Sequence, residues 1–184
     1  MHAGGGIPVL ETDRLLLRAP SADDLAASTE MWSNPEVVRH IGGKPFTRED
    51  VWGRILRGLG LWSMLGYGYW AVYDKASGRF VGDVGFADFH RAFEPSIEGV
   101  PEMGWVLDPW CHGRGYASEA VSAALRWGSA SLDVSEFSCI IDPANAPSRN
   151  VAAKAGFAQV AETLYKDAPI LIFRRPASGA AVKG

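Results

Sequence analysis

Short apolar runs and segments of helical periodicity alternate along most of the chain. Between positions 51 and 62, the residues Val51, Ile55, Leu59 and Trp62 recur at the spacing of an amphipathic helix. The periodic segments predict helices over 21–32, 47–65, 117–132 and 148–155. The apolar runs predict strands over 14–19, 69–73, 80–86, 100–107, 137–141, 157–164 and 170–173. This mixture predicts one α/β domain with a single central sheet.

The two ends of the chain lack this periodicity. Residues 1–9 include three consecutive glycines, and residues 176–184 are rich in small side chains. We therefore expect flexible tails at both ends and a single domain over residues 10–175. Inside the domain, the segment Asp74–Arg79 has the composition of a hairpin loop, and residues 90–99 are expected to form a longer loop.

Composition narrows the classes of function. The net charge of −3 does not indicate a basic surface, so no nucleic-acid partner is expected. No run approaches the roughly 20 apolar residues of a membrane span, and no signal segment is evident, so we expect a cytoplasmic protein without a membrane partner. Cys111 and Cys139 are too few for a disulfide framework or a metal cluster, and no metal is expected.

The most informative motif is the sequence Cys-His-Gly-Arg-Gly-Tyr-Ala-Ser at 111–118. It follows the strand-like run that ends at Leu107 and opens the alanine-rich helical segment. A glycine-rich turn at a helix start presents unpaired backbone N–H groups at the positive end of the helix dipole, which favours a phosphate or pyrophosphate. Gly113 and Gly115 let the backbone approach an anion closely. A tight strand-to-helix turn that binds nothing is the alternative.

A second motif favours the anion-binding interpretation over the plain turn. Residues 145–157 contain Asn145 and Ser148 and end in Lys-Ala-Gly-Phe. Together the two motifs resemble the GNAT superfamily of acyl-CoA-dependent N-acetyltransferases, with 112–117 as its pyrophosphate loop and 145–157 as its Asn-x-x-Ser…Lys-x-Gly-Phe signature. The segments 10–18 and 32–37 resemble the ribosomal-protein N-terminal (Rim-type) branch. The resemblance runs from about residue 10 to residue 174, and His112 departs from the usual Gln or Arg.

The resemblance implies a fold and a co-substrate. The fold is a mixed, mostly antiparallel central sheet with helices on both faces, splayed between two central strands so that acetyl-CoA can enter. The loop amides are expected to hold the pyrophosphate, and the strand at 105–107 to pair with the pantetheine arm. A solvated helix face explains Asn150 equally well. The expected binding residues are Trp105, Val106, Leu107, His112, Gly113, Arg114, Gly115, Tyr116, Ala117, Ser118, Asn145, Ser148 and Asn150.

Transfer of an acetyl group to an amine needs a base and an acid. An alkyl amine has a pKa near about 10, so a carboxylate is needed to remove its proton. Glu102 is the first candidate for the base and Glu119 the second, although each also fits a purely structural role. Ser148 or Tyr165 is expected to protonate the leaving thiolate. Ser148 has a second interpretation as the cap of the helix after Pro147.

The predicted function is direct transfer from acetyl-CoA to a primary amine, either a protein N-terminus or a small molecule. The alternatives are a non-catalytic acyl-CoA-binding sensor and a plain interaction domain. A homodimer is possible, but no pairing face is indicated. Trp32, Trp52 and Trp62 lie in the two-helix region that should shape the acceptor pocket, where ordinary helix packing explains them at least as well.

Overall fold

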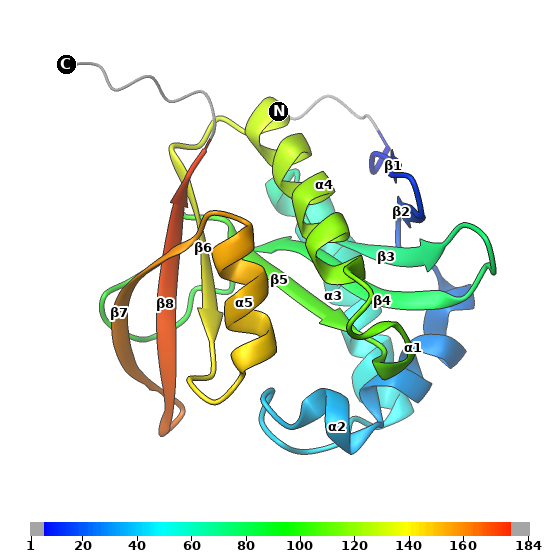
Figure 1. The fold of residues 1–184 in the computed structure, drawn as a ribbon, viewed down its shortest axis with the longest axis horizontal. Helices are drawn as coiled ribbons and strands as arrows, with labels where there is room; N and C mark the ends of the chain where they lie inside the picture. The colour runs from blue at the N-terminus through cyan, green and yellow to red at the C-terminus, as the bar shows by residue number, and fades with distance from the viewer. Residues whose placement is uncertain (1–5, 178–184) are drawn as a thin grey trace.

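One sheet of eight strands forms the centre of the molecule, in a computed structural model that describes residues 6–177 (Figure 1). The strand order is β1-β2-β3-β4-β5-β6-β8-β7. Neighbours are antiparallel except β5 and β6, which are parallel. The strands are β1 (Leu10–Glu11), β2 (Leu15–Arg18), β3 (Tyr69–Asp74), β4 (Phe80–Ala87), β5 (Glu102–Leu107), β6 (Glu136–Ile141), β7 (Ala158–Tyr165) and β8 (Ala168–Pro176).

Helices cover both faces of this sheet. The helices are α1 (Leu25–Trp32), α2 (Pro35–Val38), α3 (Arg48–Leu65), α4 (Tyr116–Ser131) and α5 (Ala146–Lys154). In Figure 1, α4 and α5 lie in front of the sheet and α3 lies behind it. This arrangement confirms the predicted mixed α/β fold with a mostly antiparallel sheet.

Separate apolar cores lie on the two faces. On the α4 face, the side chains of β3, β4 and β5 pack against α4, and the fully buried Trp70 and Phe86 are among the largest of them. On the opposite face, Trp32 of α1 and Val51 of α3 pack against Ala71 of β3. Burial at about 25 cal/mol per Å² of apolar surface makes these two interfaces the main source of stability. The helices therefore hold β4 and β5 rigidly between them.

Local sequence signals explain where the longest helix begins and ends. Thr47 accepts a hydrogen bond from the Asp50 amide, and Asp50 accepts one from the Thr47 amide, which forms a capping box at the start of α3. At its other end Gly66 adopts a left-handed conformation with φ of +75°. The predicted bounds of 47–65 follow from these signals.

Several boundaries differ from the prediction. The helix α2 was not predicted, and it begins after Asn34, whose side chain accepts from the Glu36 amide. The strand β8 extends to Pro176, inside the segment expected to be a tail, because its residues 171–176 pair with β6. Residues 6–9 also contact the domain, since Trp70 donates a hydrogen bond to the Pro8 carbonyl at 2.8 Å. The remaining parts of the expected tails, 1–5 and 178–184, lie outside the described residues.

Candidate active site

The sheet opens between its two parallel strands. Within residues 6–177, β5 and β6 share a single residue pair, Glu102 with Ser138. Figure 1 shows the two strands diverging from that point toward their carboxyl ends. The splay that the sequence resemblance implies is therefore present, and a crevice outside the carboxyl ends of parallel strands is where open α/β sheets bind ligands.

Backbone groups of β5 face this gap. The Ser138 amide donates to the Pro101 carbonyl, whereas the Asp108 amide donates to Val81 on the β4 side. Because backbone groups alternate along a strand, the odd-numbered residues of β5 direct theirs toward β6. Trp105 lies beyond the last β5–β6 pair and so directs its N–H and C=O into the widening gap.

The glycine loop lies at the carboxyl end of β5. Gly113 and Gly115 have φ of +73° and +77°, left-handed values that other residues adopt only at a cost. Gly115 is the N-cap of α4 and offers no side chain to the helix amides. Within the described chain, the N–H groups of Tyr116, Ala117 and Ser118 find no acceptor, and the first helical bond is from Glu119 to the Gly115 carbonyl at 3.1 Å. Three amides at a positive helix end form a site for an anion.

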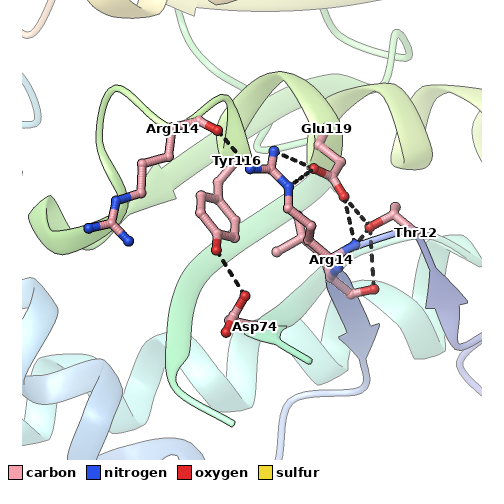
Figure 2. Close-up of polar contacts among 7 residues, drawn as sticks. Thr12, Arg14, Asp74, Arg114, Tyr116 and Glu119 are labelled. Atoms are coloured by element: carbon pink, nitrogen blue, oxygen red, sulfur yellow. Dashed lines mark hydrogen bonds and ion pairs between the residues drawn. The ribbon is translucent and has the colours of Figure 1, made fainter. Parts of the chain in front are cut away.

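An ion-paired cluster fixes this loop to the amino-terminal strands (Figure 2). The Arg14 guanidinium contacts the Glu119 carboxylate at 2.5 Å and donates to the Arg114 carbonyl at 2.9 Å. Thr12 donates to the same carboxylate at 2.6 Å. Glu119 is thus fully engaged in holding the loop, which supports its structural interpretation over a role as base.

Tyr116 anchors the same loop from below. Its hydroxyl donates to Asp74 at 2.9 Å, and this hydrogen bond raises the pKa of the Tyr116 phenol. The Arg14 guanidinium lies 4.4 Å from the centre of the Tyr116 ring. In Figure 2, Tyr116 points down to Asp74 while the Arg114 side chain points away from the cluster. The backbone of the loop is therefore held in place while the Arg114 side chain is exposed.

The side chains of His112 and Cys111, beside the loop, are engaged with the protein itself. The His112 ring places Nε2 3.0 Å from the Leu107 carbonyl oxygen, a contact that requires Nε2 to carry the proton. This ring therefore holds the loop against the end of β5. Cys111 is buried, and burial raises the pKa of its thiol to about 11. A protonated buried thiol agrees with an inert cysteine rather than a nucleophile.

The second motif forms the start of α5, which follows the carboxyl end of β6. The Asn145 side chain accepts from the Ser148 amide at 3.1 Å and is the N-cap. The interpretation of Ser148 as the cap is therefore wrong, because the helix begins two residues earlier than predicted. Ser148 lies in the first turn and Asn150 on an exposed part of the helix. The loop and the start of α5 flank the two sides of the splay.

Glu102 and Tyr165 meet through an arginine that sequence analysis did not identify. Glu102 is 5% exposed and accepts two hydrogen bonds from Arg91, at 2.7 and 2.9 Å. The Arg91 guanidinium also lies 5.0 Å from the centre of the Tyr165 ring. Two predicted catalytic residues thus share one partner at the closed end of the splay. Ser148, at the start of α5, is not part of this cluster.

A small pocket on the α1–α3 face contains a second carboxylate. Asp83 of β4 accepts from the Trp32 indole at 2.9 Å, and burial raises the pKa of this carboxyl group. Burial, and next the charge of Glu102, also raises the pKa of the Tyr69 phenol. A Cβ at Gly104 would lie 2.1 Å from the Tyr69 hydroxyl, so the phenol rests directly on β5. The pocket and the Glu102 cluster are therefore adjacent.

Asp83 is a candidate site residue that the sequence analysis did not identify. It stands within the apolar run of a predicted strand, and a lone acid there is a signal that the sequence does contain. The three tryptophans of the two-helix region have different environments. Trp62 packs against Trp70 and Trp127 in the core, whereas Trp32 contributes to the pocket through Asp83. Trp52 is exposed on α3.

Comparison with known proteins agrees with this geometry. The family described as acetyltransferase (GNAT) domain matches residues 14–158. The chain belongs to this family. Among curated proteins, the GNAT chain is 30% identical to the uncharacterized N-acetyltransferase YoaA of Bacillus subtilis (strain 168), over 82% of each chain.

Solved structures share the GNAT fold. An acetyltransferase from Agrobacterium tumefaciens str. C58 superposes with a TM-score of 0.78 at 26% identity, covering 95% of this chain and 98% of that one. RimL, a ribosomal L7/L12 alpha-N-protein acetyltransferase solved with coenzyme A, gives a TM-score of 0.74 at 17% identity, covering 92% and 98%. At that identity the likeness to RimL concerns the fold alone.

The described residues provide neither a cluster of metal ligands nor a membrane-spanning helix. Residues 6–177 hold no group of three or more His, Cys, Asp or Glu side chains that could bind a metal ion. Over the same range, no helix is long and apolar enough to cross a membrane.

Proposed function

We propose that this GNAT acetyltransferase moves the acetyl group of acetyl-CoA to a primary amine by direct transfer in a ternary complex. The observation that carries the proposal is the splay between β5 and β6. At its open end, the N–H groups of Tyr116, Ala117 and Ser118 have no hydrogen-bond acceptor within the described chain. An extended arm along β5 from Leu107 to Glu102 would span roughly 16 Å at about 3.3 Å per residue. RimL, with the same fold, is solved with coenzyme A.

The residues that hold the co-substrate follow from this placement. The amides of Gly113, Gly115 and the first turn of α4 bind the pyrophosphate. The Trp105 backbone pairs with the pantetheine arm, as an added strand pairs with a sheet edge. The other residues that we expect to bind the co-substrate lie at the end of β5, in the loop and at the start of α5, and they are Val106, Leu107, His112, Arg114, Asn145, Ser148 and Asn150.

The chemistry needs one proton removed and one supplied. The amine nitrogen attacks the thioester carbonyl, so that a C–N bond forms and the C–S bond breaks. A carboxylate takes the amine proton, and Ser148 or Tyr165 gives a proton to the departing thiolate. We assign stabilisation of the oxyanion to the Trp105 N–H, and one such donor is worth about 10²–10³ in rate.

Two carboxylates are candidates for the base. Both oxygens of Glu102 are engaged by Arg91, which favours a positioning role. Asp83 lines the pocket, and one of its oxygens is bonded by Trp32. Asp83 is therefore the stronger candidate for taking the proton, directly or through water.

Calorimetric titration with acetyl-CoA tests the binding part of this proposal. Gly115→Glu should abolish micromolar binding, because it places a carboxylate and a strained φ at the anion site. Gly78→Glu is the matched control, since Gly78 has φ of +70° in the β3–β4 hairpin and open space around it. Failure of the folded unmodified protein to bind acetyl-CoA would refute both the transferase and the sensor hypotheses.

Thiol release with a panel of amines tests the catalytic part. The panel contains free amino acids, polyamines and peptides with free N-termini. Release with at least one amine, matched by an acetylated product in mass spectrometry, would support transfer. Binding of acetyl-CoA without release across the panel would favour the sensor.

A further inference from the structure

The pocket on the α1–α3 face contains an arginine whose buried Nε has no hydrogen-bond acceptor within residues 6–177. Arg54 of α3 packs its guanidinium 3.7 Å from the centre of the Trp32 ring and 5.4 Å from that of Phe46. Its Nε is buried and, among residues 6–177, has no hydrogen-bond acceptor. Burial lowers the pKa of the Arg54 guanidinium. A buried N–H without an acceptor is costly, so the unsatisfied Nε is unusual in a side chain that binds no ligand.

The residues around Arg54 form a small recess that is partly open to solvent. The same pocket is lined by Arg57, which lies 5.3 Å from the centre of the Phe89 ring, and by Asp83. The cavity has a volume of about 40 Å³. At roughly 10–15 Å³ for each water, that space suits about three heavy atoms, the size of a carboxylate group.

The charges of the pocket do not balance without a ligand. Two arginines line it against one carboxylate, Asp83, while the nearby Glu102 is already paired with Arg91. The pocket is therefore cationic at its Arg54 side and anionic at Asp83. This complements a molecule with a negative and a positive group a few atoms apart, and it repels a purely cationic acceptor.

We propose that the acceptor is a small amine that also carries a carboxylate, held by Arg54 with support from Arg57 while its amine faces Asp83. This inference rests on the proposed acetyl transfer and names the class of acceptor. Arginine suits the task because its planar donors bind a carboxylate through two parallel hydrogen bonds. A free amino acid and a peptide with an acidic first residue share this chemistry.

Matched substrate pairs test the inference. Each amino acid is compared with its α-carboxamide, and the intrinsic reactivity favours the carboxamide, whose amine is less basic. A preference for the acid therefore reports binding of the carboxylate. We expect kcat/KM to be about 10–100-fold higher for the acid, the range of a lost hydrogen bond to a charged group. Peptide amides that begin with Asp or Glu distinguish a side-chain carboxylate from the α-carboxylate.

Variants link the preference to the arginine. Arg54→Gln should bring the acid-to-carboxamide ratio close to one by raising KM for the acid, and Arg54→Lys should keep part of it. Arg48→Gln, on the exposed first turn of the same helix, is the matched control and should change nothing. Circular dichroism of each variant verifies folding, and Arg54→Lys keeps the test valid if Arg54→Gln does not fold.

Three outcomes would overturn the inference. An unmodified enzyme that acetylates carboxamides or polyamines as well as amino acids has no anion requirement. If a folded Arg54→Gln variant keeps the preference for the acid, a residue other than Arg54 recognises the carboxylate. Absence of any turnover despite acetyl-CoA binding would refute the transferase function itself, and the inference would fall with it. The first two results leave the transferase function standing, so the two failures are distinguishable.

Discussion

At the scale of single residues, the environment of each carboxylate decides what it can do. Glu102 and Asp83 both lie on the α1–α3 side of neighbouring strands, yet only Glu102 has an arginine on both of its oxygens. Asp83 has the Trp32 indole and a partly buried setting instead. The same residue chemistry therefore supports a positioning role at one site and proton transfer at the other.

Asp83→Asn should separate these two roles. Because the Asp83 pKa lies above its ordinary value, kcat/KM of the unmodified enzyme should rise with pH through that raised pKa. The variant should lose this acidic limb and about 10²–10³ in kcat/KM. The measurement is the pH profile of kcat/KM, with Glu102→Gln as the comparison. A full loss of the acidic limb in Glu102→Gln alone would assign the base to Glu102.

The same substitution should change how stability depends on pH. A carboxyl group whose pKa is raised in the folded state binds protons more tightly there than in the unfolded chain. Its contribution is present at low pH and is lost as pH rises from the ordinary carboxyl value of about 3.9 through the raised pKa of Asp83. Asp83→Asn should remove this pH-dependent component. The free energies of unfolding of the two proteins, measured with urea, should therefore be similar at low pH, and the variant should be the more stable at high pH. A constant difference across pH would contradict it.

At the scale of elements, the anion site depends on contacts between segments far apart in the sequence. The β1–β2 turn supplies Arg14 and Thr12, which hold the first turn of α4 through Glu119. These contacts hold the first turn of α4, and with it the amides of the loop, in position. A glycine-rich loop alone would fluctuate between conformations, since glycine has the largest backbone entropy.

Glu119→Gln should therefore weaken co-substrate binding, although the Glu119 side chain does not contact the co-substrate. Loss of the charged partner of Arg14 is expected to raise the Kd for acetyl-CoA about tenfold, or ~1.4 kcal/mol. Glu49→Gln, at the exposed first turn of α3, changes the net charge equally and should leave the Kd unchanged. Calorimetric titration measures both. An unchanged Kd in Glu119→Gln would show that the loop keeps its geometry without the ion pair.

At the scale of the whole molecule, the splay is a gap in an otherwise continuous sheet. Within residues 6–177, the two halves, β1–β5 and β6–β8, are paired at one position, Glu102 with Ser138. A ligand that pairs with β5 would supply the missing bridge. Any ligand that binds only the folded state stabilises it by mass action.

Acetyl-CoA at about 100 times its Kd should stabilise the fold by about 2.7 kcal/mol, which corresponds to a rise in Tm of roughly 5–10 °C. Thermal unfolding with increasing acetyl-CoA measures the rise, and Gly115→Glu should not show it. Hydrogen exchange should slow at the Trp105 and Leu107 amides. Protection confined to residues outside β5, β6 and the loop would contradict the proposed site.

The sequence by itself determined the elements and the motif that we propose binds the co-substrate. Alternating and helical periodicity reflect which face of a segment is buried, so they predicted most strands and the long helices. The glycines and the cap of α3 mark backbone conformations that only a few residue types adopt. These are local properties, and local sequence encodes them.

Only the tertiary structure decided which side chains meet. Arg91 reaches Glu102 and Tyr165 from a loop that has no periodicity, and Arg54 and Asp83 come together from a helix and a strand about thirty residues apart. The position of Ser148 in the first turn of α5 was decided by the start of this helix, where the Asn145 side chain is the cap and accepts from the Ser148 amide. Burial and pairing depend on neighbours distant in the chain, so the charge state and role of each acid follow from the fold rather than from the motif.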